Sequence, residues 1–196
     1  MRTWGHSFTM QAMRPDPERT DEALAVRASR GDEQAVAELV RRTSGPLYRF
    51  IRRYGHERAE CDDLFQDTWM RVLSSLDRFD PRLRFSTWLF QIALNRCRDQ
   101  SRRNGVRARF RGMAEGAPPE EPGPSVEEGA DARKVLDVVR QLPAPYREVL
   151  LLRYYSGFSE TETAEILGCP GGTVKSRLHA AVKAVRRDLK EEETGA

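Results

Sequence analysis

SETETAEILGCPGGTVKSRLHAAVKAVRRDL, residues 159–189, is the stretch from which the fold class follows. It reads as two helices joined by a sharp turn. Ser159, with Glu162 three residues later, forms a capping-box pattern at the start of the first helix. Gly168 tolerates the left-handed conformation that ends a helix, and Pro170 stops one hydrogen-bond ladder but suits the start of the next. The spacing therefore predicts a helix-turn-helix.

The second of these helices has two different faces. Its apolar residues recur at helical spacing and predict a buried stripe of Val174, Leu178, Ala181, Val182, Val185 and Leu189. The opposite face is small near its N-terminus and basic further along, which suits a helix that enters the major groove while cations meet phosphates. The candidate DNA-contacting residues are Gly172, Thr173, Lys175, Ser176, Arg177, His179 and Lys183. An ordinary helical hairpin with a solvated basic face has the same spacing.

Length and composition bound the class of protein. The chain has 196 residues, enough for one large or two small domains, and a formal net charge of +3 with clustered basic residues. Cys61, Cys97 and Cys169 are widely separated and odd in number, which favours reduced buried thiols. Histidines and cysteines show no metal-ligand spacing, so no metal or other cofactor is expected. No apolar run reaches membrane-spanning length, and we expect a soluble cytoplasmic protein without membrane insertion.

The N-terminal half shows a series of helical patterns and no strand-like alternation. Residues 1–19 lack periodicity and are expected to be a flexible leader. A first helix follows from Thr20, and Asp32 is a suitable N-cap for a second. Gly45 and Pro46 are expected to break or kink this second helix.

The next helix, expected over residues 62–76, carries a strong apolar stripe that includes Leu73. Asp62 and Asp63 are expected at its positive end, where the helix dipole favours them. The other face is acidic and contains Met70, and an exposed methionine among acids indicates a protein partner. The candidate partner-binding residues are Asp63, Gln66, Asp67, Met70 and Arg71.

A loop over residues 77–84 leads into a helix, expected over 85–103, whose apolar residues cover most of its circumference. The remaining stripe consists of Gln91, Asn95, Arg98 and Arg102 and runs into a tail rich in arginine. Amides form hydrogen bonds with base edges and guanidinium groups bind phosphate, so the stripe suits a surface along which a nucleic-acid strand binds. A core helix with one solvated edge is the alternative from this pattern alone.

Residues 112–130 are rich in glycine, proline, alanine and glutamate, which predicts a flexible acidic linker that leaves two halves loosely tethered. Helical patterns resume at Asp131. We therefore expect an all-α fold with two small helical domains. The expected division is a leader over 1–19, a first domain over 20–105, a linker over 106–130, a second domain over 131–190 and a tail over 191–196.

Two motif sets in this order resemble those of a known family. CDDLFQDTWMRVLSSLDRFD (61–80) with RLRFSTWLFQIALNRCRDQSRR (82–103) is similar to region 2 of the extracytoplasmic-function (ECF) sigma factors, a group of the sigma-70 family of bacterial RNA polymerase. LPAPYREVLLLRYYSGFSETETAEILGCPGGTVKSRLH (142–179) is similar to their region 4. The resemblance implies a transcription initiation factor that binds core RNA polymerase and promoter DNA. Many relatives are held inactive by an anti-sigma factor, although no residue here identifies such a partner.

The resemblance also implies roles for the residues already singled out. The 62–76 helix would grip the polymerase clamp, and the last hairpin would read the −35 promoter element. The loop and helix over 80–103 would melt the −10 element and hold a flipped base, with Asn95 at a base-contacting position and Trp88 at a mostly structural one. The implied −10 residues are Asp80, Arg82, Arg84, Phe85, Gln91, Asn95, Arg98 and Arg102. Ala180 and Val182 stand where many relatives carry further arginine, which leaves the −35 preference open.

Two other classes of function compete with this interpretation. A stand-alone helix-turn-helix regulator would bind DNA without any polymerase subunit. A metal-dependent nuclease would use Asp62, Asp63 and Asp67, but these acids would have to converge on one site, and a helix start explains them more simply. The sequence contains no nucleophile–base arrangement and no phosphate-cradling glycine loop, so we expect no enzyme.

Overall fold

The computed structural model describes residues 20–111 and 129–194, and within these two stretches every regular element is helical. The elements are α1 (Asp21–Ser29), α2 (Glu33–Tyr54), α3 (Arg58–Ser74), α4 (Phe85–Arg111), α5 (Ala130–Gln141), α6 (Ala144–Leu150), α7 (Glu160–Leu167) and α8 (Gly171–Thr194). A 3-10 turn (Leu76–Arg78) follows α3, and a π-helical turn (Leu151–Tyr155) continues α6. The predicted all-α class is confirmed. The predicted leader and residues 112–128 of the predicted linker lie outside the described residues.

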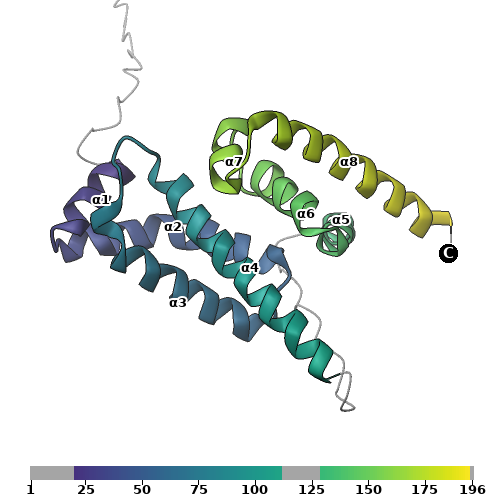
Figure 1. The fold of residues 1–196 in the computed structure, drawn as a ribbon, viewed down its shortest axis with the longest axis horizontal. Coiled ribbons are helices and arrows are strands. Elements are labelled where there is room, and N and C mark those ends of the chain that lie inside the picture. The colour runs from purple at the N-terminus through teal and green to yellow at the C-terminus, as the bar shows by residue number, and fades with distance from the viewer. Residues whose placement is uncertain (1–19, 112–128, 195–196) are drawn as a thin grey trace, which may run out of the picture.

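The helices form two groups that lie against each other. Figure 1 shows α1 to α4 gathered in one group and α5 to α8 in the other, with α7 next to α4. At this contact the ring of Phe90 on α4 meets the ring of Phe158 edge to face, with centroids 4.8 Å apart, and both side chains are buried. In this arrangement apolar surface between the halves is therefore removed from water.

The predicted helix caps are confirmed. Asp32 accepts hydrogen bonds from the N–H groups of Gln34 and Ala35, at 3.0 and 3.1 Å. Ser159 and Glu162 form the complete capping box, with each side chain accepting from the other residue's backbone N–H. These oxygens satisfy N–H groups that have no partner inside the helix.

Glycine also ends a helix where the sequence predicts it. Gly168 has a φ of 64°, in the left-handed region, and ends α7. Three residues later α8 begins at Gly171, directly after Pro170. The sharp turn of the helix-turn-helix is therefore made as the sequence indicates.

Gly45 and Pro46 do not break the second helix. α2 runs without interruption from Glu33 to Tyr54, with Pro46 inside it. Proline cannot donate one hydrogen bond to the helix, but the turns beyond it bury four large side chains in the core: Leu47, Phe50, Ile51 and Tyr54. Burial of this face offsets the missing bond, so tertiary packing overrides the local signal.

The third helix begins one turn earlier than predicted. Glu57 is the N-cap of α3 and Arg58 its first residue, so Asp62 and Asp63 lie in the second turn and not at the positive end. Buried Cys61 extends the apolar face in the N-terminal direction. Leu73 was expected on the buried stripe but is 44% exposed. The helix ends at Ser74, so Leu73 lies at its last turn, and the 3-10 turn carries Leu76 into the core in its place.

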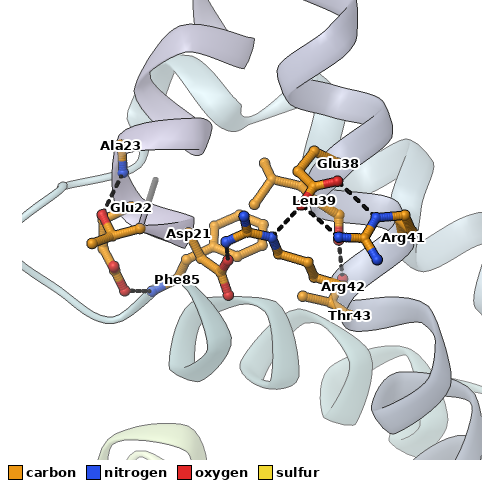
Figure 2. Close-up of polar contacts among 10 residues, drawn as sticks. Asp21, Glu22, Ala23, Glu38, Leu39, Arg41, Arg42, Thr43 and Phe85 are labelled. Carbon is orange, nitrogen blue, oxygen red and sulfur yellow. Dashed lines mark hydrogen bonds and ion pairs between the residues drawn. The ribbon is translucent and has the colours of Figure 1, made fainter. Parts of the chain in front are cut away.

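The first helix fixes the start of α4. Figure 2 shows the Glu22 carboxylate accepting a hydrogen bond from the backbone N–H of Phe85, the first residue of α4, at 3.0 Å. Arg42 of α2 donates to Asp21 and to Glu38, at 3.1 and 2.6 Å, and so binds α1 to α2 (Figure 2). A carboxylate from another helix thus acts as a cap at the positive end of α4.

Candidate nucleic-acid interface

The outward face of α8 is open along the residues singled out from the sequence. On the buried side, Val174 and Ala181 have no exposed surface, and the rest of the predicted apolar stripe is half-buried. The exposed predicted residues are Gly172, Lys175, Ser176, His179 and Lys183, whereas Thr173 and Arg177 are half-buried. The first turn presents small side chains and the following turns present cations, which is the arrangement of a helix that can enter a groove of DNA.

Contacts within the hairpin hold the start of α8 against α7. The Lys175 ammonium lies 3.6 Å from the Glu160 carboxylate, at the surface. The half-buried Arg177 places its guanidinium 4.0 Å from the Cys169 sulfur in the turn. An exposed ion pair such as Lys175–Glu160 contributes little stability. Lys175 can therefore leave Glu160 and bind a phosphate at a small cost in free energy.

The polar stripe of α4 is present, but its members differ in exposure. Gln91, Asn95 and Arg102 are exposed, and Arg98 is half-buried. Phe85, predicted at the −10 interface, is fully buried, packed edge to face against Phe79 at 5.6 Å between ring centroids. This corrects the prediction for the Phe85 side chain, because it belongs to the core that supports the helix and not to its surface.

A pocket opens beside Asn95. Its volume is about 290 Å³, and its walls come from the end of α3, the 3-10 turn and α4: Arg71, Ser75, Arg78, Trp88, Ile92, Asn95 and Arg96. The Trp88 ring is half-buried and packs on Phe79, with centroids 5.2 Å apart. The pocket therefore combines an immobilised aromatic ring, one amide and several guanidinium groups. A planar base with hydrogen-bonding edges and an adjoining phosphate suits such a set of groups.

Several wall residues were not singled out from the sequence. Ser75, Arg78 and Arg96 lie within the two quoted region 2 stretches but were not among the candidate site residues, and Trp88 was assigned a mostly structural position. Arg71 was predicted on the partner-binding face of α3 but also lines this pocket. The spacing of arginines at the end of α3 and along α4 was the available signal, but only the packing of the two helices shows that they converge.

The loop before α4 is organised by a local ion pair. The Asp80 carboxylate accepts from the backbone N–H of Arg82 at 3.0 Å and from its guanidinium at 2.6 Å. These hydrogen bonds from Arg82 lower the pKa of Asp80 to about 2. Because the Arg82 side chain is 87% exposed, the turn presents a cation to the solvent.

Two predicted DNA-binding arginines meet carboxylates of the second half of the chain. Arg84 lies 3.1 Å from Glu162, the capping residue of α7. Arg98 donates two hydrogen bonds to Glu148 of α6, at 2.8 and 2.6 Å. A third, Arg102, pairs with Asp99 on its own helix. The structure thus brings two of the predicted −10 cations, Arg84 and Arg98, next to the second helical group.

The outward face of α3 is exposed along all five predicted partner-binding residues: Asp63, Gln66, Asp67, Met70 and Arg71. Met70 is 68% exposed, and the exposed Leu73 extends this apolar spot towards the end of the helix. Asp62 faces elsewhere, since it accepts a hydrogen bond from the Tyr48 hydroxyl at 2.7 Å. An apolar spot within an acidic surface is typical of a protein-binding site.

The described part of the chain comprises residues 20–111 and 129–194. Within these ranges there is no group of three or more acidic, histidine or cysteine side chains that could hold a metal ion. No helix in the same ranges is long and apolar enough to span a membrane. All three cysteines are free thiols, with Cys61 and Cys97 buried and Cys169 half-buried.

Comparisons with known proteins match both helical groups. Residues 39–107 match the model of sigma-70 region 2, and residues 132–185 match that of sigma-70 region 4. The chain is 36% identical over 167 residues to the RNA polymerase sigma factor NccH of Alcaligenes xylosoxydans xylosoxydans, covering 82% of this chain and 90% of the relative. It is 30% identical over 176 residues to the ECF RNA polymerase sigma factor SigW of Bacillus subtilis, covering 83% and 92%.

A solved structure also resembles the chain as a whole. It is the complex of the sigma factor RpoE with the anti-sigma factor NepR from Bartonella quintana, with a TM-score of 0.68 and 26% sequence identity. The match covers 79% of this chain and 96% of that one, so it includes helices from both groups.

Proposed function

This chain belongs to the extracytoplasmic-function group of the sigma-70 family, and from that membership we propose which of its surfaces contact the promoter and the polymerase. As an RNA polymerase sigma factor, it directs the initiation of transcription. The observation that carries the proposal is the pair of surfaces described above, one on α8 and one on α4 with its pocket. Each lies in the segment that matches the corresponding family region.

We propose that the exposed face of α8 reads the −35 element. Thr173 and Ser176 in the first turns offer hydroxyl groups to base edges, and Lys175, Arg177 and Lys183 neutralise phosphates. The exposure of Ser176 and Lys183 and the open first turn of α8 support these roles.

We propose that the pocket beside Asn95 receives a base extruded from the −10 element. The Asn95 amide would bond the base edge, the Trp88 ring would support stacking, and arginines at the rim would hold the adjoining phosphates. The exposed guanidinium of Arg82 in the preceding loop supports a basic approach to the same pocket.

We propose that α3 docks on core polymerase through Asp63, Gln66, Asp67 and Met70. No catalytic role is assigned to any residue, and the chain would act in the cytoplasm, where core polymerase is found. The RpoE structure contains an anti-sigma factor. We extend this by analogy and propose that an anti-sigma factor also regulates this chain.

Lys183→Ala tests the −35 assignment. Loss of one phosphate contact should weaken duplex binding almost equally on all sequences and reduce the slope of log affinity against log salt by about one. Ser176→Ala should instead change the sequence preference. Fluorescence anisotropy on a panel of duplexes at several salt concentrations measures both effects. Unchanged binding by both variants would contradict the assignment of α8.

Reconstitution with core polymerase tests the function itself and separates it from a stand-alone regulator. A single helix-turn-helix module buries roughly 600–1,000 Å² on DNA, so the free chain should bind duplex weakly. Docking on core fixes the two surfaces on one body and should raise promoter affinity by about a hundredfold or more. Transcription from a library of promoter templates, with and without the chain, measures this. Tight specific binding by the chain alone, with no affinity for core, would favour the regulator.

A further inference from the structure

Glu148 is a buried carboxylate at the contact between the two halves of the chain. It lies on α6, and its residue surface is 2% exposed. A carboxylate in such a place is costly unless it is paired and fully hydrogen-bonded. The partners of Glu148 come from the other half, so its burial depends on the two halves being in contact.

Two side chains of the first half satisfy Glu148. Arg98 of α4 binds both carboxylate oxygens in a bidentate pair, with Nε–Oε1 at 2.8 Å and Nη2–Oε2 at 2.6 Å. The Tyr54 hydroxyl at the end of α2 donates to Oε1 at 2.9 Å. Burial and the neighbouring Glu148 raise the pKa of Tyr54, so this hydroxyl keeps its proton and remains a donor. Arg147, next to Glu148, lies over the Tyr54 ring at 4.6 Å from the centroid.

A bidentate guanidinium–carboxylate pair has the same geometry as a guanidinium–phosphate pair. Arg98 lies on the polar stripe of α4 that the sequence predicts to contact the −10 element, and in this structure its hydrogen-bonding fork is directed at Glu148. Arg84, at the start of the same surface, lies beside Glu162 of α7 in a similar way. DNA phosphates could bind Arg84 and Arg98 only if the carboxylates of Glu162 and Glu148 moved away from them.

We propose that the described arrangement is a closed state in which Glu148 takes the place of a promoter phosphate on Arg98. Arg98 then binds either Glu148 in the closed chain or DNA in the open one, and the two states exclude each other. The inference rests on the proposed function, because it takes the Arg98 stripe as a DNA-binding surface. Core polymerase or DNA would favour the open state by binding it better than the closed one.

Glu148→Gln in the full-length chain tests the closed state. The amide keeps the shape but removes the charge, and hydrogen bonds to charged groups are strong enough that the open-to-closed ratio should rise roughly tenfold to a hundredfold. Small-angle X-ray scattering should report a larger radius of gyration than for the wild type. Affinity for a single-stranded DNA oligonucleotide of mixed sequence, measured by anisotropy, should rise because more of the chain is competent to bind.

Two further variants make the result specific. Glu165→Gln removes the same charge at an exposed position of α7 and should change neither the scattering nor the affinity for the oligonucleotide. Arg98→Ala should open the chain as Glu148→Gln does but should bind the oligonucleotide no better than the wild type, because the shared cation is missing. Circular dichroism of each variant verifies that the helices remain folded.

Three results would overturn the proposal. They are wild-type scattering that already matches separated halves, an unchanged radius of gyration in Glu148→Gln, and opening of that variant without a gain in single-stranded DNA binding. Transcription with core polymerase by the wild type reports separately on the sigma-factor assignment, so the two failures can be distinguished.

Discussion

Asn95→Ala should leave the affinity for core polymerase unchanged and reduce promoter opening roughly tenfold to a hundredfold. The Asn95 side chain is exposed at the wall of a pocket that also contains an aromatic ring and several guanidinium groups, and it supplies the pocket's one amide for the edge of an extruded base. A good amide–base contact is worth about 1–3 kcal/mol of discrimination. That contact forms only after the base has left the stack. Its loss should therefore reduce promoter opening and leave the initial binding of the duplex unchanged.

Permanganate footprinting of unpaired thymines measures opening, and co-purification with core measures assembly. Gln141→Ala removes an exposed amide from the end of α5, far along the chain from the pocket, and serves as the matched control. A −10 panel should show the largest defect for one base position. Equal strand opening by Asn95→Ala and the wild type on every −10 variant would remove Asn95 from the site.

Local features of the fold could be predicted from the sequence because their causes are local. Asp32, Ser159 and Gly168 end or begin helices through bonds and backbone conformations within four residues of themselves. Apolar spacing identified the buried side of α8 for the same reason. Pro46 was misjudged because its cost is local, whereas the compensation comes from side chains that pack against other helices.

The candidate site could be predicted only in part. The polar stripe of α4 follows from helical spacing, and Asn95 was found in this way. The pocket could not be found, because Arg78 and Arg96 converge only when α3 and the following turn pack against α4. Phe85 was placed at the interface by its position in a motif, but a side chain's burial depends on the aromatic neighbours that surround it.

The contact between the two halves was the feature of the structure that the sequence predicted least. Arg98 and Glu148 are separated by fifty positions, and a segment of unremarkable acidic composition lies between them. An arginine on a polar stripe and a glutamate in an apolar helix give no sign that they form a pair. The glutamate inside the YREVLLL run was the available signal, since a charge within a buried stretch requires a partner.

The acidic face of α3 gives the second large effect. Asp63→Lys combined with Asp67→Lys should reduce affinity for core polymerase by about a hundredfold or more, because like charges facing each other across an interface cost several kcal/mol. Both side chains are exposed on one face with Met70, and within residues 20–111 and 129–194 neither takes part in a hydrogen bond or ion pair that the substitution would break. Helix content and thermal stability should therefore stay near those of the wild type.

Asp137→Lys combined with Glu165→Lys makes the same change in net charge on the second half of the chain and is the control for charge, although it also removes the ion pair between Asp137 and Arg140. Surface plasmon resonance against immobilised core enzyme, followed by transcription, should separate the two pairs of substitutions: the α3 pair loses both signals, and the control pair keeps core affinity. The α3 pair should also retain the wild-type affinity for duplex DNA, since α8 is untouched. If the α3 pair bound core as tightly as the wild type, then Met70 and Leu73 would have to form an apolar contact without electrostatic help, and the docking surface would need to be sought on another face of the first half.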